Sequence, residues 1–328
     1  MNNKLKPKII SIICGFIMIA VCILVSFCRQ PKNAISGQKE NYKAIIEIWQ
    51  IDTFEGGVGS RTTFLRNTAN NFSKKYKDLL FLVTSHTIET ANNLIEKGVY
   101  PDLISYGGNS FNIINKLQNI KGYSQKDGGD LSNKRYMLAW CKGGYFEIKR
   151  SSVKTHSKVI VSNGEFNLGS VAKLFSSYNS CDSVIMTPKE SYTAFLNDKN
   201  SVLIGTQRDI FRLKSREIDF TATPINEYCD MYQYISVVYK SDEKSSQSMT
   251  FLKYLLSEEV QKTLTKIGMY SCLYDNLYLE DEKMNLLKCE NTTYIISPYA
   301  DKNRLNEIKS ISISAKSSSD VINLLKHL

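Results

Sequence analysis

The pattern of apolar and polar residues predicts that the folded part of the chain opens with a strand, a glycine-rich loop and a helix. Residues 45–51 are mostly β-branched or aromatic, as expected of a buried strand. Residues 55–59 contain three glycines and favour a loop. Ser60 can then cap a helix whose apolar residues recur at helical spacing up to Tyr76. Such a junction exposes backbone N–H groups, which suit a bound oxygen or anion.

The same pattern continues with alternating strands and helices. Strands are expected over 79–83 and 101–105, with a helix near 87–97 between them that Gly98 ends. This alternation implies parallel pairing and an α/β sheet. In such sheets ligands bind beyond the carboxyl ends of the strands. Those ends correspond to residues 52–59, 84–87 and 106–110.

A second α/β region follows an extended aromatic segment. Residues 136–148 are broken by the pair Gly143 and Gly144, which suits a crossing strand or hairpin close to a ligand. The elements predicted after it are a helix over 168–178, strands over 183–186, 202–204 and 232–239, one or two helices over 248–267 that end at Gly268, and a final helix over 321–328.

The N-terminus carries the signature of an exported protein. Three lysines, at positions 4, 6 and 8, precede an uncharged, mostly apolar run over residues 9–27. As a helix this run would just cross a bilayer core, and the basic flank predicts that the rest of the chain lies outside. A cleaved signal peptide, an uncleaved anchor and a lipoprotein signal ending at Cys28 remain alternatives. We therefore expect attachment to the outer face of the cytoplasmic membrane.

Composition narrows the function classes. The formal net charge is +10, and residues 1–40, with six basic residues and one acidic residue, supply +5 of it. No basic stripe interleaved with aromatic residues is present, so nucleic-acid binding is not expected. The cysteines form no C-x-x-C pair and the three histidines are far apart, so neither a disulfide framework nor a metal site is expected.

Six separated segments carry a family resemblance in the right order between residues 45 and 272. They are IWQIDTFEGGVGSR, PDLISYG, YMLAWCKGGYFEI, AFLNDKNSVLIGTQRDIFRL, DMYQYISVV and FLKYLLSEEVQKTLTKIGMYS. The ordered set resembles the extracellular solute-binding proteins of ABC importers, family 1, carbohydrate type. The resemblance implies a two-lobed, periplasmic-binding-protein-like (type II) α/β fold with a hinge and an interlobe ligand cleft, preceded here by an N-terminal hydrophobic helix. It also implies ABC permease subunits as partners.

The resemblance divides the chain into six parts. The expected parts are 1–28 as signal or anchor, 29–42 as tether, 43–150 as the first part of lobe 1, 151–240 as lobe 2, 241–285 as the return to lobe 1, and 286–328 as a C-terminal segment.

Aromatic residues are the first candidates for a saccharide site, because sugar rings stack their apolar C–H faces on aromatic side chains. Trp140, beside the glycine pair, is the leading candidate, followed by Tyr145, Tyr106 and Tyr232. The alternative for each is an ordinary place in the core. Trp49 lies in the middle of a predicted strand and is expected to be core.

Polar candidates lie in the two loops that follow predicted strands. Asp52 and Glu55 can accept hydrogen bonds from sugar hydroxyls, cap the loop, or act as the acid and base of a glycosidase. Gly57 belongs to the same loop, and Arg61 is either a ligand donor or a solvated helix residue. No second carboxylate pair and no nucleophile–base motif accompanies them, so binding is favoured over catalysis.

In the second region, Gln207 and Arg208 directly follow a predicted strand. Arg208 offers a planar fork of donors suited to a carboxylate, a phosphate or vicinal hydroxyls, or it pairs with Asp209 or Glu217. The complete predicted ligand set is Asp52, Glu55, Gly57, Arg61, Tyr106, Trp140, Tyr145, Gln207, Arg208 and Tyr232, with no catalytic residue, metal or cofactor.

The resulting hypothesis is capture of a small solute, a sugar or oligosaccharide above all, for delivery to a permease. The protein is not expected to be an enzyme. Two alternatives stay open: a membrane-anchored sensor or interaction protein with the same fold, and a surface glycoside hydrolase that uses Asp52 and Glu55.

Overall fold

The structure is a computed structural model, and its described part covers most of the chain after residue 42. The described residues are 43–54, 56–108, 113–123, 125, 127, 129–153, 155, 158–164, 183–225, 228–274, 276–281, 284–285, 294–295, 298–299, 303, 306–307 and 310. Glu55, the N-terminal apolar run and the predicted helices over 168–178 and 321–328 lie outside this part. Residues Tyr42–Leu328 form one compact unit. Within the described residues, no helix combines the length and apolar character needed to span a membrane.

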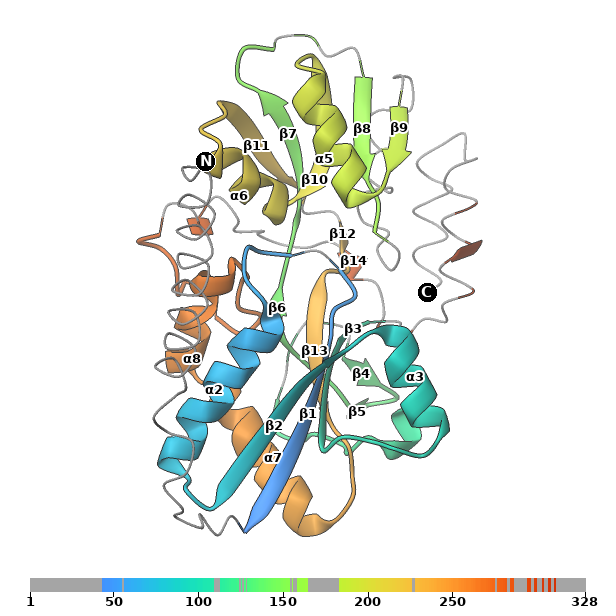
Figure 1. Ribbon diagram of the computed structural model, residues 1–328, viewed down its shortest axis with the longest axis vertical. Helices are drawn as coiled ribbons and strands as arrows, with labels where there is room; N and C mark the ends of the chain where they lie inside the picture. Colours follow the sequence, from blue (N-terminus) through green and yellow to red (C-terminus); the bar gives the residue numbers. More distant parts are fainter. Residues whose placement is uncertain are drawn as a thin grey trace, which may run out of the picture. The chain divides into compact units, whose positions relative to one another are not determined.

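The first of two five-stranded sheets has the strand order β2-β1-β3-β13-β6 (Figure 1). Its strands are β1 (Ala44–Ile51), β2 (Leu79–His86), β3 (Leu103–Gly107), β6 (Leu138–Lys142) and β13 (Tyr232–Val237). β1 pairs in parallel with β2 and β3, which confirms the predicted parallel opening. β13 runs antiparallel to both β3 and β6.

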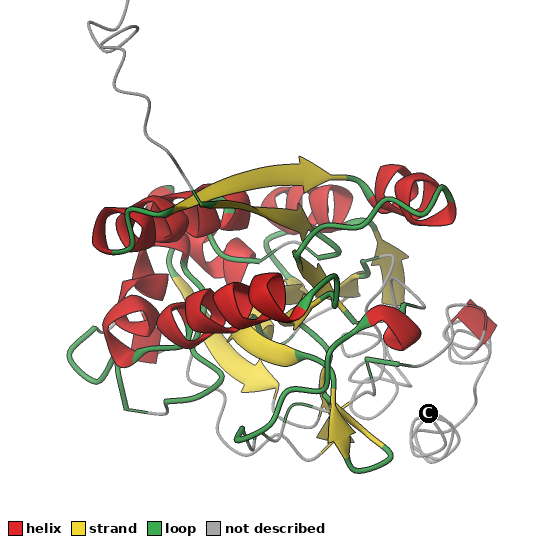
Figure 2. Ribbon diagram, turned by 90° about the horizontal axis from the view of Figure 1, so that it is seen from below, coloured by secondary structure: helices red, strands yellow, loops and turns green. Residues whose placement is uncertain are grey.

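Helices pack around the strands of this first lobe (Figure 2). They are α2 (Arg61–Lys75), α3 (Ile88–Glu96), α7 (Asp242–Leu255) and α8 (Glu258–Lys262), with the 3-10 turns η1 (Ile114–Lys116) and η2 (Thr263–Ile267). Phe72 of α2 meets Phe81 of β2 and Phe251 of α7 edge to face, at ring distances of 5.5 and 5.6 Å. Trp49 is 1% exposed and lies in a separate buried cluster with Ala91 of α3, which confirms it as core.

The predicted helical stripe over 248–267 is an interrupted series of helices rather than one. α7, α8 and η2 follow one another, and the series ends at Gly268, whose φ of 62° is left-handed. Glycine adopts that conformation without the steric cost that a Cβ brings, so it terminates the helix here as predicted.

The second sheet has the strand order β11-β7-β10-β8-β9. Its strands are β7 (Tyr145–Arg150), β8 (Lys158–Ser162), β9 (Ser183–Met186), β10 (Ser201–Thr206) and β11 (Phe220–Ile225), accompanied by helices α5 (Pro188–Asn197) and α6 (Gln207–Ser215). β8 is parallel to β9 and β10, whereas β7 is antiparallel to β10 and β11. The described residues also form two small ribbons: β4 (Asp130–Leu131) with β5 (Lys134–Arg135), and β12 (Tyr228–Cys229) with β14 (Tyr294–Ile295).

The chain crosses between the sheets earlier than the predicted boundaries. β6 belongs to the first sheet and β7 to the second, so the outward crossing is at Gly143 and Gly144 (Figure 1). The return occurs between β11 and β13, because β13 already pairs with strands of the first sheet. The sheet membership of β7 and β13 places both crossings before the expected boundaries at residues 150 and 240, and the lobe boundaries themselves stay predictions. An apolar run predicts a strand but not the sheet that it joins, which only the pairing partners decide.

Candidate functional site

The loop after β1 is organised by a buried arginine. Arg61, the first residue of α2, is 5% exposed, and its Nε donates to Asp52 Oδ1 at 2.7 Å. Its Nη2 donates to the backbone carbonyl of Phe54, and its guanidinium carbon lies 4.2 Å from the centre of the Phe54 ring. The Asp52 side chain stays 47% exposed. Arg61 thus shapes the loop, and Asp52 presents a carboxylate to solvent.

Gly57 lets this loop lie against the end of η2. Its φ is +66°, and a Cβ built on it would lie 1.8 Å from the carbonyl oxygen of Ile267. The next residue, Val58, donates its backbone N–H to that same oxygen at 2.9 Å. The predicted role of Gly57 in ligand binding stays a prediction, while its structural role is a close backbone approach that a side chain would block.

A row of buried polar side chains crosses the first sheet beneath this loop. Gln50, Ser105, Gln233 and Trp140, here called the polar row, lie on β1, β3, β13 and β6 and are each 0% exposed. Ser105 Oγ accepts from Gln233 Nε2 at 3.1 Å and from Trp140 Nε1 at 2.9 Å. Gln50 Nε2 donates to Asp52 Oδ1 at 2.9 Å, which joins the polar row to the loop.

Three polar atoms around the polar row are buried without a hydrogen-bond partner in the described part of the chain. They are Gln50 Oε1, Gln233 Oε1 and Arg61 Nη1. Burying an unsatisfied polar group costs roughly 1–3 kcal/mol, so such atoms are uncommon and call for an explanation. Two acceptors and one donor beside a half-exposed carboxylate match the hydrogen-bonding capacity of hydroxyl groups, which both donate and accept.

The four predicted aromatic residues are all packed within the described structure. Trp140 stacks on Phe64 of α2 with ring centres 5.5 Å apart and an interplanar angle of 15°. Tyr106 is 1% exposed, and desolvation by burial raises its pKa to about 12. Tyr145 donates to Asp230 Oδ1, and Tyr232 is 4% exposed. Stacking of a solute on any of these rings stays a prediction, and for Trp140 it would require displacement of Phe64.

Gln207 joins the two lobes. This first residue of α6 is 2% exposed, and its Oε1 accepts the backbone N–H of Gly144 at the outward crossing. Its Nε2 lies 3.4 Å from the carbonyl oxygen of Gly268 and 3.3 Å from Met269 Sδ, both on the return segment of lobe 1. The side chain therefore links the second lobe to the crossing and to the first lobe.

The start of α6 is held by a buried carboxylate. Asp209 is 2% exposed, its Oδ2 accepts from the backbone N–H of Thr206 at 2.9 Å, and its Oδ1 pairs with Arg212 Nη1 at 3.3 Å. Arg208 lies in the same first turn with a partly exposed side chain. Of the predicted set, Asp52 and Arg208 are thus the described side chains that reach solvent at strand ends.

The polar row was not predicted, although a signal for part of it exists. Ile46 and Ile48 face the same side of β1 as Gln50, so the glutamine occupies an inward-facing position of a buried strand. β1 has apolar residues on both faces, so its sequence does not alternate clearly between apolar and polar positions. For that reason the sequence alone did not indicate that Gln50 faces inward.

The described part of the candidate site is rich in hydrogen-bonding groups. No group of three His, Cys, Asp or Glu residues among them could hold a metal ion. Burial raises the pKa of the Cys141 thiol, which is fully buried, so it is not a thiolate nucleophile at neutral pH. Asp52 pairs with a guanidinium, and the described site offers hydrogen-bond donors and acceptors rather than an activated nucleophile.

Comparison with solved structures identifies the fold. The sugar-binding protein MalE from Xanthomonas citri is 10% identical, with a TM-score of 0.59 over 87% of this chain and 96% of that one. The GacH receptor of Streptomyces glaucescens, solved unliganded and with acarbose, is 12% identical, with a TM-score of 0.59 over 86% and 98% of the two chains. A two-component system protein that mediates signal transduction is 10% identical, with a TM-score of 0.54 over 81% and 99%.

These similarities show the two-lobed fold of solute-binding proteins, as predicted, and at such low identity they show the fold alone. No protein-family model matches the sequence, and no curated protein matches it. The solved structures with this fold include a sugar-binding protein, a receptor solved with acarbose and a signal-transduction protein.

Proposed function

We propose that this chain is the extracellular solute-binding component of an ABC importer and that its solute is a sugar or oligosaccharide. The observation that carries the proposal is the set of unsatisfied buried atoms on Gln50, Gln233 and Arg61 beside the half-exposed Asp52. Hydroxyl groups of a saccharide would satisfy both acceptors and the donor, and Asp52 would accept a further hydroxyl hydrogen bond. The sugar ligands of proteins that share the fold support the same solute class.

The site requires the two lobes to separate and close. Gln50 and Gln233 are fully buried. A solute therefore reaches their side chains only after the lobes separate and the loop after β1 shifts. The contacts of Gln207 with Gly268 and Met269 bridge the lobes and would form in the closed state. A solute that binds the closed state more tightly shifts the equilibrium towards it, and the closed form docks on the permease.

In the second lobe, Arg208 is the residue proposed to bind the solute. It follows β10 in the way that the loop of Asp52 follows β1, at the carboxyl end of a parallel strand. Its guanidinium suits vicinal hydroxyls. The apolar run near the N-terminus, with its basic flank, supports export and attachment to the outer face of the membrane, which are part of the same proposal.

Thermal unfolding of residues 38–328 against a ligand panel tests this proposal. The panel contains mono- and oligosaccharides, sugar phosphates, amino acids and peptides. A ligand that binds only the folded state raises the unfolding midpoint by mass action, so one saccharide class should raise it in proportion to the logarithm of concentration. The shift should shrink in Asp52→Asn and Arg208→Gln. A folded fragment whose midpoint responds to no saccharide would overturn the proposal.

A sensor role is the second candidate, favoured by the similarity to a signal-transduction protein with the same fold. Saccharide binding is expected in both roles, so the two are separated in cells. Loss of the protein abolishes uptake of labelled saccharide if it serves an importer. If uptake persists while the transcriptional response to the saccharide is lost, the sensor role is correct.

A further inference from the structure

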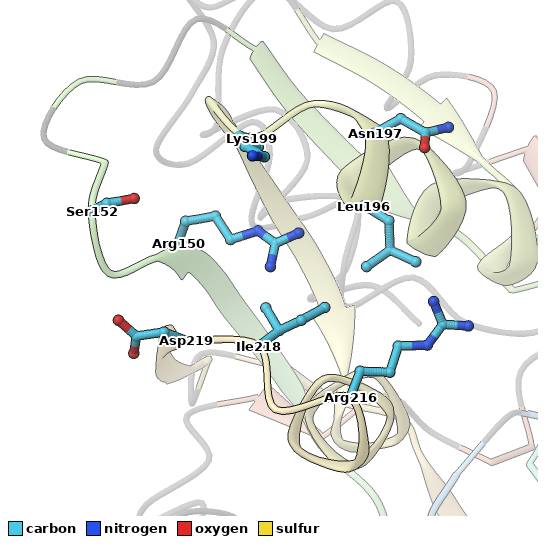
Figure 3. Close-up of a pocket in the computed structure, with 8 residues that line it drawn as sticks. All are labelled: Arg150, Ser152, Leu196, Asn197, Lys199, Arg216, Ile218 and Asp219. Carbon is cyan, nitrogen blue, oxygen red and sulfur yellow. The ribbon is translucent and has the colours of Figure 1, made fainter.

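A pocket in lobe 2, whose lining side chains Figure 3 shows, lies at the end of α6 opposite to Gln207. It has a volume of about 540 Å³, and the lining residues that matter here are Arg150, Lys199, Arg216, Leu196 and Ile218. They come from the end of β7, the turn before β10, the end of α6, the end of α5 and the approach to β11. Because β10 begins beside this pocket and ends at Thr206, its six residues, at about 3.3 Å each, separate the pocket from the proposed solute site.

Positive charge dominates the pocket. Arg150, Lys199 and Arg216 line it, and no ion pair joins any of them to an acidic residue in the described part of the chain. The one lining carboxylate, Asp219, accepts from Ser151 Oγ at 2.7 Å. In Figure 3 it points away from both guanidinium groups. Three cations against one lining carboxylate leave the pocket with excess positive charge, and a bound anion would reduce the repulsion among the cations.

Arg150 is held by a ring contact, but one of its donors is unsatisfied in the described part of the chain. Its Nε is buried and lacks a hydrogen-bond partner, and its guanidinium carbon lies 5.2 Å from the centre of the buried Phe195 ring. Arg216 follows the last turn of α6, where the helix dipole stabilises a cation. Arg150 ends a strand and gains no such stabilisation. An oxygen ligand bound close to this guanidinium would supply the acceptor that the described residues do not provide.

The floor of the pocket is apolar. Figure 3 shows the side chains of Leu196 and Ile218 between the guanidinium groups of Arg150 and Arg216. Guanidinium groups bind phosphate oxygens through paired, charge-assisted hydrogen bonds, and the volume lies in the range of small-molecule sites, about 300–1,000 Å³. We propose that this pocket binds a phosphomonoester that carries a compact apolar group, with the phosphate between the cations and the apolar group on Leu196 and Ile218.

Calorimetric titration of phenyl phosphate into the full chain, held in a non-ionic detergent, tests this site. One saturable site is expected, and inorganic phosphate should bind at least fivefold more weakly because it lacks the apolar group. Arg150→Gln and Arg216→Gln should each weaken phenyl phosphate binding by tenfold or more. Arg216 is exposed, so its replacement leaves folding intact even if Arg150→Gln does not.

The matched control is Lys189→Gln, which removes the same charge from an exposed position near the start of α5. It should change the dissociation constant by less than twofold. Asp52→Asn, in the proposed solute site, should leave phenyl phosphate binding unchanged. Loss of saccharide binding would therefore not affect this proposal, and absence of phenyl phosphate binding would not affect the proposed function. Absence of saturable binding to the wild-type chain, or equal weakening in Lys189→Gln, would overturn the proposal.

Discussion

Each lobe has a strand that is followed by a helix, and the connection between strand and helix differs between the two lobes. In lobe 1, β1 and α2 are joined by the loop over residues 52–60, whose described part is held by Arg61 and by Gly57. In lobe 2, β10 ends at Thr206 and α6 begins at the next residue, with no loop between them. Both connections lie at the carboxyl end of a parallel strand, the position where α/β sheets bind ligands.

The difference lies in where each connection places its charge. The loop of lobe 1 buries its cation and leaves its carboxylate, Asp52, half exposed. The turn of lobe 2 buries its carboxylate, Asp209, and uses the buried Gln207 to join the lobes. Lobe 1 therefore presents a carboxylate to solvent at this connection, whereas lobe 2 uses its connection for contacts between the lobes.

Gly57→Ala should produce the largest effect, because it breaks the lobe 1 connection by steric conflict. The added Cβ would have a left-handed φ and would lie 1.8 Å from the carbonyl oxygen of Ile267. We expect the free energy of unfolding to fall by about 3 kcal/mol or more, measured by chemical denaturation.

Gly98→Ala is the matched control for this prediction. Gly98 has a φ of +76° and no neighbouring atom within 4 Å of its built Cβ. Its replacement carries the left-handed strain alone, about 1 kcal/mol. Equal losses in the two variants would show that the contact with Ile267 is not what demands glycine at position 57.

Arg61→Gln comes next in size. It removes the hydrogen bonds to Asp52 and to the Phe54 carbonyl, as well as the stacking on the Phe54 ring. Because Asp52 remains half exposed, no fully buried charge is left behind, and a loss of about 2 kcal/mol in unfolding free energy is expected. Lys74→Gln, at an exposed position of the same helix, should cost less than about 0.5 kcal/mol. A small loss in Arg61→Gln would mean that the loop does not depend on it.

Asp209→Asn tests the turn of lobe 2 and should have a smaller effect. An asparagine oxygen can still accept from the Thr206 N–H, so the change removes chiefly the pair with Arg212. We expect a loss of about 1 kcal/mol by chemical denaturation. Saccharide affinity should change less than in Arg61→Gln. A larger effect on affinity than on stability would contradict the positioning role assigned to this turn.

The fold was largely readable from the sequence where apolar spacing was strong. The opening strand, the glycine loop and α2 follow directly from the pattern of residues 45–76, and the predicted strand over 183–186 is β9. The expected lobe boundaries differ from the observed sheet crossings because β7 and β13 look like any other apolar strand, and their sheet membership depends on distant partners. Local sequence does not encode that choice of partner.

The candidate site could be predicted from the sequence only in part, because side-chain packing also depends on residues distant in the sequence. Asp52 and Arg208 were predicted as ligand residues because they follow strands, where topology alone places a ligand, and both side chains reach solvent there. Trp140 was selected for its position beside two glycines, yet its ring packs on Phe64, a helix residue far away in the sequence. Gln50 was not predicted as a site residue. Its burial and the lack of a hydrogen-bond partner for its Oε1 in the described part of the chain result from tertiary packing.

Gln50→Met should have the smallest effect on stability. The change removes one hydrogen bond to Asp52, but it also removes a buried acceptor that has no partner in the described part of the chain. The two contributions oppose each other, and methionine has a similar length and shape. The free energy of unfolding should change by less than about 1 kcal/mol. A loss of several kcal/mol would show that Gln50 is a structural residue.

The central claim is that the polar row and Arg61 supply hydrogen bonds to a saccharide. The most direct test is calorimetric titration of the saccharide found in the thermal screen into wild-type protein and into Gln50→Met. The account predicts that Gln50→Met weakens binding by tenfold or more while its unfolding free energy stays within about 1 kcal/mol of wild type. An unchanged dissociation constant in a folded Gln50→Met variant would contradict it.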